Sequence, residues 1–265
     1  MLGAIIGDIV GSRFEHNNIK TKNFKLLTDQ CRPTDDTIMT LAIAKAILEC
    51  NENYSNLDRM AEEWMQYFGR KYSNAGYGNS FFNWLYMDFP KPYNSYGNGS
   101  AMRVSACAYA AHSLSEAKDF SKSVTKISHN HPEGIKGAEA AVVAVYMALH
   151  GSSISQIRDR INDNYYPMNF TIDGIRDSYT FDVTCQGSVP QAIMAFLESS
   201  DFEDAIRNAV SIGGDSDTIA AITGSIAEAY YGIPEKISNQ IFAFLDKDMI
   251  IILNEFEEKY RSVQN

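Results

Sequence analysis

Apolar residues recur along this chain at the three- and four-residue spacing of an α-helix. The clearest run lies on one helix face and comprises Ile219, Ile222, Ile226 and Tyr230. Further segments of this kind are 57–72, 138–150, which two glycines bound, and 235–260, which is predicted to break near Asp246. Few segments show the two-residue period of a strand, so the pattern predicts a mainly helical single domain.

The first residues form an apolar run that contains regularly spaced glycines, and either a strand or a helix would explain this pattern. Gly3, Gly7 and Gly11 are spaced four apart. A strand leading into a phosphate-binding loop is one interpretation. Spacing by four aligns the glycines on one side of a helix and permits close helix packing, so a helix is favoured. The polar stretches 74–98 and 152–189 are predicted to be loops or short irregular elements, where binding groups tend to lie.

Composition limits the classes of partner. The chain has 265 residues, enough for a large core, and a formal net charge of -10. This charge argues against a nucleic-acid backbone or an anionic membrane as the main partner. The cysteines lie far apart without a C-x-x-C pair, at Cys31, Cys50, Cys107 and Cys185. No secretory signal or membrane-spanning stretch is recognisable, so a reduced, cytoplasmic setting is the default expectation.

Two short segments resemble each other because each brings two aspartates and a Thr-Ile to the start of an apolar helix. The first is Thr34-Asp35-Asp36-Thr37-Ile38, and the second runs from Gly213 through Asp215-Ser216-Asp217-Thr218 to Ile219. Helix capping explains one such residue per helix. Two carboxylates in each segment repel unless a cation screens them. Carboxylate and hydroxyl ligands favour Mg²⁺, Mn²⁺ or Ca²⁺. Capping and a metal site both remain open.

Other polar residues carry weaker signals. Glu15 lies just after the first predicted helix and, taken alone, is a solvated surface acid. His129 and His131 form an H-x-H pair without a third zinc ligand nearby, so they are expected to bond a ligand or to cap the following helix. The stretch 93–103 places glycines before a predicted helix, where exposed backbone N–H groups suit a phosphate or diphosphate, and it lacks the pattern of a P-loop. A plain glycine turn is the alternative.

These motifs taken together resemble the ADP-ribosylglycohydrolase family. They are G-A-I-I-G-D-I-V-G-S-R-F-E, T-D-D-T, G-Y-G at 76–78, S-Y-G-N-G-S-A-M-R, S-H-N-H-P, and G-G-D-S-D-T-I-A-A-I-T-G. Their order and spacing run nearly end to end. The resemblance implies a compact all-α fold, an orthogonal helical bundle forming one domain over 1–265. It also implies two divalent cations, Mg²⁺ or Mn²⁺, in a cleft.

The resemblance also implies roles for particular residues. The implied metal ligands are Thr34, Asp35, Asp36, Asp215, Asp217 and Thr218. Glu15 matches a mobile-loop glutamate that acts as an acid/base residue or a substrate gate, and the implied catalytic set is Glu15, Asp35, Asp36 and Asp217. The loop around the diphosphate corresponds to Ser95, Tyr96, Gly97, Asn98 and Gly99, with Gly78 closing over the same group. His129 matches a histidine lining the distal ribose pocket.

The implied reaction is metal-assisted hydrolysis of the bond between ADP-ribose and an acceptor on a protein or small conjugate. Family members that release ADP-ribose from arginine carry an acid in the loop that corresponds to segment 71–81, which contains no carboxylate here. The G-Y-G and S-Y-G-N-G motifs resemble the branch acting on ADP-ribosylserine and O-acetyl-ADP-ribose, although arginine stays open. Two alternatives remain: a metal-dependent phosphohydrolase of nucleotide diphosphates, and a non-catalytic member like the lens crystallins that share this fold.

Overall fold

Helices make up the regular structure of the computed structural model, which describes residues 1–260; positions 261–265 of the predicted domain lie outside the described residues. The described part contains fourteen α-helices and no β-strand, which confirms the predicted all-α fold class. The helices are α1 (Leu2–Gly11), α2 (Asp35–Glu49), α3 (Leu57–Lys71), α4 (Asn79–Leu85), α5 (Ser105–Ala110), α6 (Leu114–Lys126), α7 (Pro132–Leu149), α8 (Ile154–Asn164), α9 (Ile172–Ile175), α10 (Cys185–Leu197), α11 (Phe202–Ser211), α12 (Ser216–Tyr231), α13 (Glu235–Ile241) and α14 (Lys247–Tyr260). Three 3-10 turns join them: η1 (Tyr54–Asn56), η2 (Asn98–Ser100) and η3 (Phe242–Phe244).

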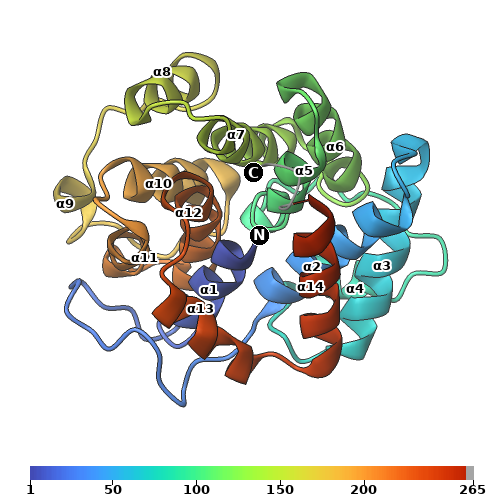
Figure 1. The fold of residues 1–265 in the computed structure, drawn as a ribbon, viewed down its shortest axis with the longest axis horizontal. Helices are drawn as coiled ribbons and strands as arrows, with labels where there is room; N and C mark the ends of the chain where they lie inside the picture. The colour runs from blue at the N-terminus through green and yellow to red at the C-terminus, as the bar shows by residue number, and fades with distance from the viewer. Residues whose placement is uncertain (261–265) are drawn as a thin grey trace.

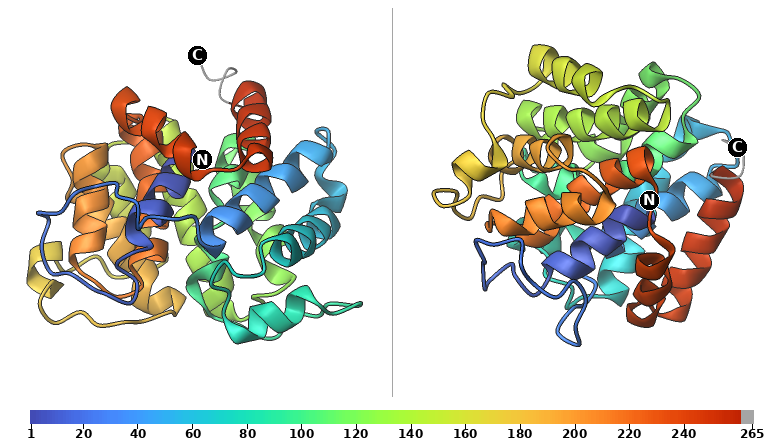
Figure 2. Two further views of the ribbon diagram at one scale, coloured as in Figure 1. Left: turned by 90° about the horizontal axis from the view of Figure 1, so that it is seen from below. Right: turned by 60° about the vertical axis from the view of Figure 1, so that its left-hand side comes forward.

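Helix α1 lies in the middle of the molecule and packs along α12 (Figures 1 and 2). Its glycines Gly3, Gly7 and Gly11 face α12 so closely that a Cβ at any of them would overlap the α12 backbone. All ten residues of α1 are buried. The predicted helix with a glycine face is therefore confirmed, and the strand interpretation is wrong.

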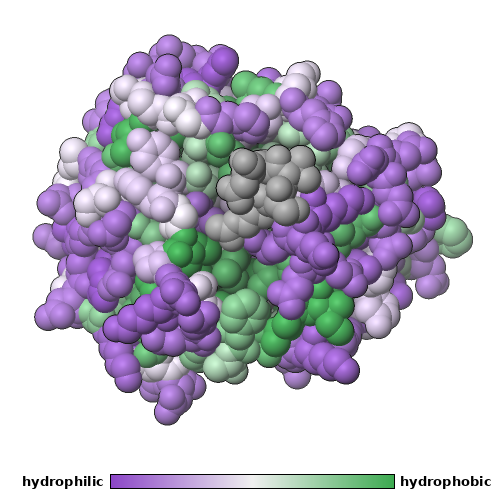
Figure 3. Space-filling view, in the orientation of Figure 1, coloured by the Kyte–Doolittle hydropathy of each residue, from purple (hydrophilic) through white to green (hydrophobic). Residues whose placement is uncertain are grey.

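The remaining helices surround this pair. Helix α2 contacts α1, α3, α5 and α14, whereas α7, α10 and α11 contact α12. Buried side chains from all these helices belong to one hydrophobic cluster. The face in Figure 3 is mostly hydrophilic at its rim, with apolar residues gathered in a band near the middle. Within residues 1–260 no helix is both long and apolar enough to cross a bilayer.

Several predicted helices agree with the structure. Segment 57–72 corresponds to α3 within one residue, and the run from Ile219 to Tyr230 lies inside α12. The segment 235–260 breaks as predicted, into α13, η3 and α14. Asp246 stands at the break, and its Oδ1 accepts hydrogen bonds from the backbone N–H groups of Asp248 (2.9 Å) and Met249 (3.0 Å).

Other boundaries were predicted wrongly. Helix α7 begins at Pro132 rather than at residue 138, because Gly137 does not end a helix but makes room for the side chain of Cys185. The predicted loop 152–189 contains α8, which buries a narrow stripe of Ile157 and Ile161 behind a capping box at Ser153. The loop 74–98 likewise contains the short helix α4.

Candidate metal centre and adjoining cavity

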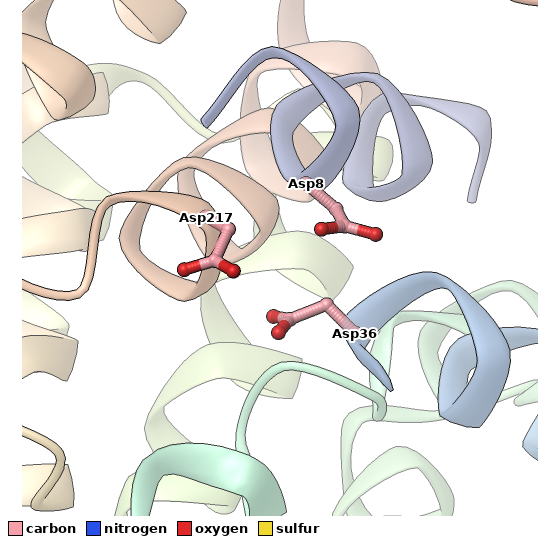
Figure 4. Close-up of side chains that lie close together, drawn as sticks. All are labelled: Asp8, Asp36 and Asp217. Atoms are coloured by element: carbon pink, nitrogen blue, oxygen red, sulfur yellow. The ribbon is translucent and has the colours of Figure 1, made fainter. Parts of the chain in front are cut away.

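The two aspartate-rich segments meet at one place although 180 positions separate Asp35 from Asp215 (215 minus 35). One segment begins α2 and the other begins α12, as predicted, and α1 contacts both helices. In Figure 4, Asp36 and Asp217 point toward each other, with Asp8 of α1 beside them. The three side chains offer carboxylate oxygens that lie within 4.8 Å of one another. Close packing of α1 against α12 thus brings the two helix starts together.

A second group of carboxylates shares Asp217. Glu15, Asp215 and Asp217 also offer oxygens within 4.8 Å of one another. Glu15 is partly exposed in the loop after α1, whereas both aspartates are buried. Asn18 ties this loop to the second segment, because its Nδ2 donates to the Gly214 carbonyl (2.9 Å) and its Oδ1 accepts from the Gly214 N–H (2.8 Å). The loop glutamate therefore lies beside the predicted metal ligands.

Burial raises the pKa values of these carboxyl groups. Desolvation is the largest cause for Asp36 and Asp217, whose pKa values lie well above the usual range, and repulsion between the aspartates raises them further. The same two causes raise the pKa of Asp35 to about 8. Asp35 belongs to neither of these two groups of close carboxylates, but it lines a cavity together with Asp36 and Asp217. Buried like charges of this kind are stabilised either by protons or by bound cations.

The oxygen atoms of the site fit a hard divalent cation. Asp36 Oδ1 is buried without a hydrogen-bond partner among the described residues, while its Oδ2 accepts from the Thr218 hydroxyl at 3.0 Å. Asp215 Oδ2 accepts from the Asn98 side-chain amide at 2.7 Å. A buried set of carboxylate and hydroxyl oxygens suits Mg²⁺ or Mn²⁺ better than a softer ion. The donor chemistry is therefore compatible with the implied cations.

Asp8 is a residue that the sequence analysis did not assign to the site. It accepts the backbone N–H groups of Thr34 (2.9 Å) and Thr37 (3.0 Å) and the hydroxyls of both threonines. These bonds lower its pKa, but burial is the larger effect and leaves the pKa raised. Asp8 thereby anchors the start of α2 at Asp36. The sequence could have indicated Asp8 because it lies inside an apolar helix, where a buried carboxylate needs hydrogen-bond partners.

Thr34 has the capping role considered above. Its hydroxyl donates to Asp8 Oδ1 at 2.6 Å and accepts the Asp36 N–H at 3.3 Å. It is buried behind the wall of the cavity rather than in its lining. Its assignment as a metal ligand stays a prediction.

The carboxylates line a cavity of about 610 Å³, a volume typical of small-molecule sites. The other predicted residues lie in the same lining, which includes Glu15, Asp35, Asp36, Gly78, Ser95, Tyr96, Gly97, Asn98, Gly99, His129, Asp215, Asp217 and Thr218. The structure therefore brings together residues that six separate sequence motifs contribute.

The glycine-rich turn at 95–99 differs from its prediction. It leads into the three-residue turn η2, and the next α-helix begins only at Ser105. The backbone N–H groups of Gly97 and Asn98 already have partners, the Ser95 hydroxyl (3.1 Å) and the Val183 carbonyl (2.8 Å). The predicted helix N-terminus with free N–H groups is therefore wrong at these two residues.

The cavity lining includes residues that the sequence did not single out. Phe181, Val183 and Thr184 line the cavity, and an isolated β-bridge joins Thr184 to Gly97. Phe81, Tyr93 and Arg103 also line it. The polar composition of 152–189 indicated a binding loop, but no pattern within it pointed to these particular positions.

The two histidines of the H-x-H pair have different environments. His129 is buried in the cavity wall, whereas His131 caps α7 by accepting the Glu133 N–H at 3.1 Å. The helix cap that the sequence left open is thus made by His131, and a ligand contact by His129 stays a prediction.

Comparison with known proteins decides the family. The sequence model of the family described as ADP-ribosylglycohydrolase matches residues 1–261. The chain belongs to the ADP-ribosylglycohydrolase family. This match covers every motif on which the resemblance was based.

Relatives in this family include ADP-ribosylhydrolases. The ADP-ribosylhydrolase ARH3 of Mus musculus is 26% identical, over 94% of this chain and 88% of the relative. The human ARH3 is 25% identical, over 94% of this chain and 90% of the relative. The ADP-ribosylarginine hydrolase Tri1 of Pseudomonas putida (strain GB-1) is 27% identical, over 88% of this chain and 70% of the relative.

A solved structure has the same fold. It is described as an ADP-ribosylglycohydrolase-related protein complex and superposes with a TM-score of 0.70 at 21% identity. The match covers 98% of this chain and 95% of that chain. The helical architecture implied by the family is therefore present here.

Proposed function

We propose that this ADP-ribosylglycohydrolase-family chain is a metal-dependent hydrolase that cleaves the glycosidic bond between ADP-ribose and an acceptor. The observation that carries the proposal is the convergence of Asp36 and Asp217, with Glu15 at the edge of the same cluster. Asp36 contributes a buried oxygen without a partner among the described residues. The ARH3 and Tri1 relatives, an ADP-ribosylhydrolase and an ADP-ribosylarginine hydrolase, supply the ADP-ribosyl substrate class.

Two divalent cations, Mg²⁺ or Mn²⁺, are the proposed cofactors. Their ligands would come from Thr34, Asp35, Asp36, Asp215, Asp217 and Thr218. Ions held by these residues would supply Lewis-acid chemistry beside the ribose. The chain's own contribution is to hold four carboxylates at fixed positions on two helix starts. Asp8 and Asn98 support this arrangement through their hydrogen bonds to Thr34 and Asp215.

Glu15 is the proposed proton-transfer residue. Its carboxylate lies near Asp217 but on a partly exposed loop, so it can face both the cavity and solvent. Burial is the largest cause that raises its pKa, and nearby Asp215 adds to it. A carboxyl group with a raised pKa can donate a proton to a leaving group nearer to neutral pH than an ordinary glutamate can. Neighbouring carboxylates stabilise the positive charge that develops on the sugar.

The remaining predicted residues would bind the nucleotide. The turn from Ser95 to Gly99 lines the same cavity as the carboxylates, where Asn98 bonds to Asp215, and it is the proposed diphosphate site. Because the N–H groups of Gly97 and Asn98 are occupied, we assign this contact to the Ser95 hydroxyl and to close backbone approach at the glycines. Gly78 and His129 are proposed to contact the same ligand.

An oxygen-linked acceptor, as in ADP-ribosylserine or O-acetyl-ADP-ribose, is the proposed leaving group. The exposed rim formed by Gly76, Gly78, Asn79 and Ser80 carries no charge. An arginine acceptor brings a guanidinium, whose recognition favours a carboxylate in fork geometry. The relatives do not separate the two acceptors, since ARH3 and Tri1 show similar identity to this chain.

The test is incubation with ADP-ribosylserine and ADP-ribosylarginine peptides, with and without Mg²⁺, followed by mass spectrometry. The proposal predicts release of intact ADP-ribose from the serine peptide only when metal is present. Release from the arginine peptide alone would overturn the acceptor assignment. Formation of AMP or phosphate would identify a phosphohydrolase, and no product from any conjugate would indicate a binding protein without catalytic activity.

A further inference from the structure

Arg103 is a fully buried cation in the cavity wall. Its guanidinium lies over the Phe81 ring, 5.5 Å from the centroid, and its Nη2 donates to Ser128 Oγ at 2.8 Å. Its Nε is buried without a partner among the described residues. Burial lowers the pKa of Arg103 only to about 10, so the side chain stays charged at neutral pH. Burying a charge costs free energy of folding unless the charge has polar partners. The hydrogen bond to Ser128 is one such partner for Arg103.

Ser128 connects Arg103 to His129. The serine is completely buried, and its Oγ lies 2.9 Å from His129 Nδ1. Arg103 cannot accept a hydrogen bond, so it must donate to Ser128 Oγ. The serine proton then needs an acceptor, and among the described residues His129 Nδ1 is the acceptor within reach. A serine that donates to Nδ1 leaves the imidazole proton on Nε2.

The Nε2 atom of His129 faces the glycine turn. Cβ atoms built on Gly97 and Gly99 would lie 3.6 Å and 3.5 Å from it. The ring centroids of Tyr93 and Phe81 lie 5.7 Å and 6.3 Å from the centroid of the imidazole, so both rings limit its rotation. Burial, and secondarily the charge of Arg103, keeps the pKa of His129 well below its usual range, so the ring is neutral.

We infer that Arg103 and Ser128 are positioning residues that lock His129 in the Nε2–H tautomer, so that it offers the cavity a fixed hydrogen-bond donor. The ligand assignment of this donor rests on the proposed function, and the tautomer does not. A fixed donor selects an acceptor oxygen, such as a ribose or phosphate oxygen, at that point of the ligand. The buried charge of Arg103 thereby acts through Ser128 on a group that faces the substrate.

The tautomer is tested without any ligand by ¹⁵N NMR of the histidine rings. The chain has five histidines, and loss of one set of signals in His129→Gln assigns the one of interest. The wild type should show His129 as the neutral Nε2–H form, and Ser128→Ala should shift it toward a mixture of tautomers. Ser225→Ala removes a buried hydroxyl whose bond goes to the Ile222 carbonyl in α12, and should change nothing. An Nδ1–H form in the wild type, or unchanged shifts in Ser128→Ala, would overturn the inference.

Arg103→Met should release the tautomer in the same way, because Ser128 would lose its donor. If that variant does not fold, Ser128→Ala decides alone.

A double-mutant cycle in ADP-ribose binding tests the consequence. Ser128→Ala should raise the Kd for ADP-ribose about tenfold, the usual result of weakening one oriented hydrogen bond. His129→Gln keeps a donor near the Nε2 position, and adding Ser128→Ala to it should change the Kd by less than about twofold. An equal loss in both backgrounds would show that Ser128 is merely structural. A wild type that does not bind ADP-ribose would refute the proposed function while the NMR result still decides the tautomer.

Discussion

The two sides of the cavity are built from different kinds of structure. The carboxylate side has Asp36, Asp215 and Asp217 in the lining, at the starts of α2 and α12, and Asp8 of α1 bonds to the start of α2. Glycine contacts hold α1 and α12 in close packing. The loop side, made of segments 95–99 and 181–184, is held by a single isolated bridge and a few hydrogen bonds. The aspartates, whose charges repel one another, thus stand at the starts of packed helices. The residues proposed to bind the nucleotide lie on loops.

The carboxylate side should account for the largest effect on activity. Asp217→Asn removes a charge shared by both carboxylate groups, so we expect turnover to fall to the rate measured without added metal. Mg²⁺ should raise the Tm of the wild type by binding the folded state, and this rise should disappear in Asp217→Asn. Steady-state kinetics and thermal scans measure both. Asp159→Asn, at an exposed position of α8, is the control and should behave as wild type. Turnover of Asp217→Asn that still depends on added metal would contradict the assignment of the metal centre to the carboxylate side.

Glu15 stands at the edge of the carboxylate side, because its loop reaches the carboxylates but stays partly exposed. Glu15→Gln keeps the shape and removes proton transfer, so turnover should fall about 10²–10⁴-fold. Binding of ADP-ribose should change far less, since the product has no leaving group to protonate. Glu63→Gln, on the exposed face of α3, is the matched control. Near-normal turnover in Glu15→Gln would reduce this residue to a solvated loop acid.

Asp8 supports the carboxylate side without being one of the predicted metal ligands. Asp8→Asn replaces an acceptor of four hydrogen bonds by a group that carries two donors, which loosens the start of α2. We expect turnover to fall about 10–100-fold, as for other residues that orient ligands. Isothermal titration with Mn²⁺ should show weaker binding in parallel. If affinity for Mn²⁺ is unchanged while the fold is intact, Asp8 only stabilises the helix.

The loop side should control nucleotide affinity alone. Gly97→Val adds a branched side chain near Ser95 Oγ and His129 Nε2, since a Cβ there would lie 3.3 Å and 3.6 Å from them. We expect the Kd for ADP-ribose to rise about tenfold, equivalent to about 1.4 kcal/mol. Stabilisation by Mg²⁺ should stay as in the wild type. Equal loss of metal and nucleotide binding would contradict the separation of the two sides.

The smallest expected effect is a pH dependence confined to the carboxylate side. The folded-state pKa values of Asp36 and Asp217 are raised, and that of Asp35 is about 8. Without metal, these groups therefore favour folding at low pH, and that contribution is lost as pH rises through their folded pKa values. Metal binding must displace the protons, so the Tm gain from Mg²⁺ should be larger near pH 8 than near pH 5.5 by a few degrees. An equal gain at both pH values would contradict the raised pKa values.

The sequence predicted the carboxylate side better than the loop side, for a physical reason. A helix with a broad buried face, such as α12, repeats its pattern locally, and acidic residues at a helix start are visible in a short window. Asp8 escaped assignment because its partners, Thr34 and Thr37, lie on another helix. Helix α8 was missed because it buries only a narrow stripe among polar residues.

The loop side depends on contacts that no local pattern encodes. The pairing of Gly97 with Thr184 joins segments far apart in the chain. It also consumes the Asn98 N–H, which the sequence suggested was free for a ligand. The short turn η2 in place of an α-helix follows from this tertiary pairing rather than from the intrinsic preferences of glycine and serine.

The most direct test of the carboxylate side is to locate Mn²⁺ by anomalous diffraction in crystals grown with the ion. The account predicts one or two anomalous peaks between the starts of α2 and α12, at about 2.0–2.6 Å from oxygens of Asp36 and Asp217. These peaks should be absent in crystals of Asp217→Asn. Well-ordered crystals that show no peak between the two helix starts, or peaks only elsewhere, would contradict the claim that these carboxylates form a metal centre.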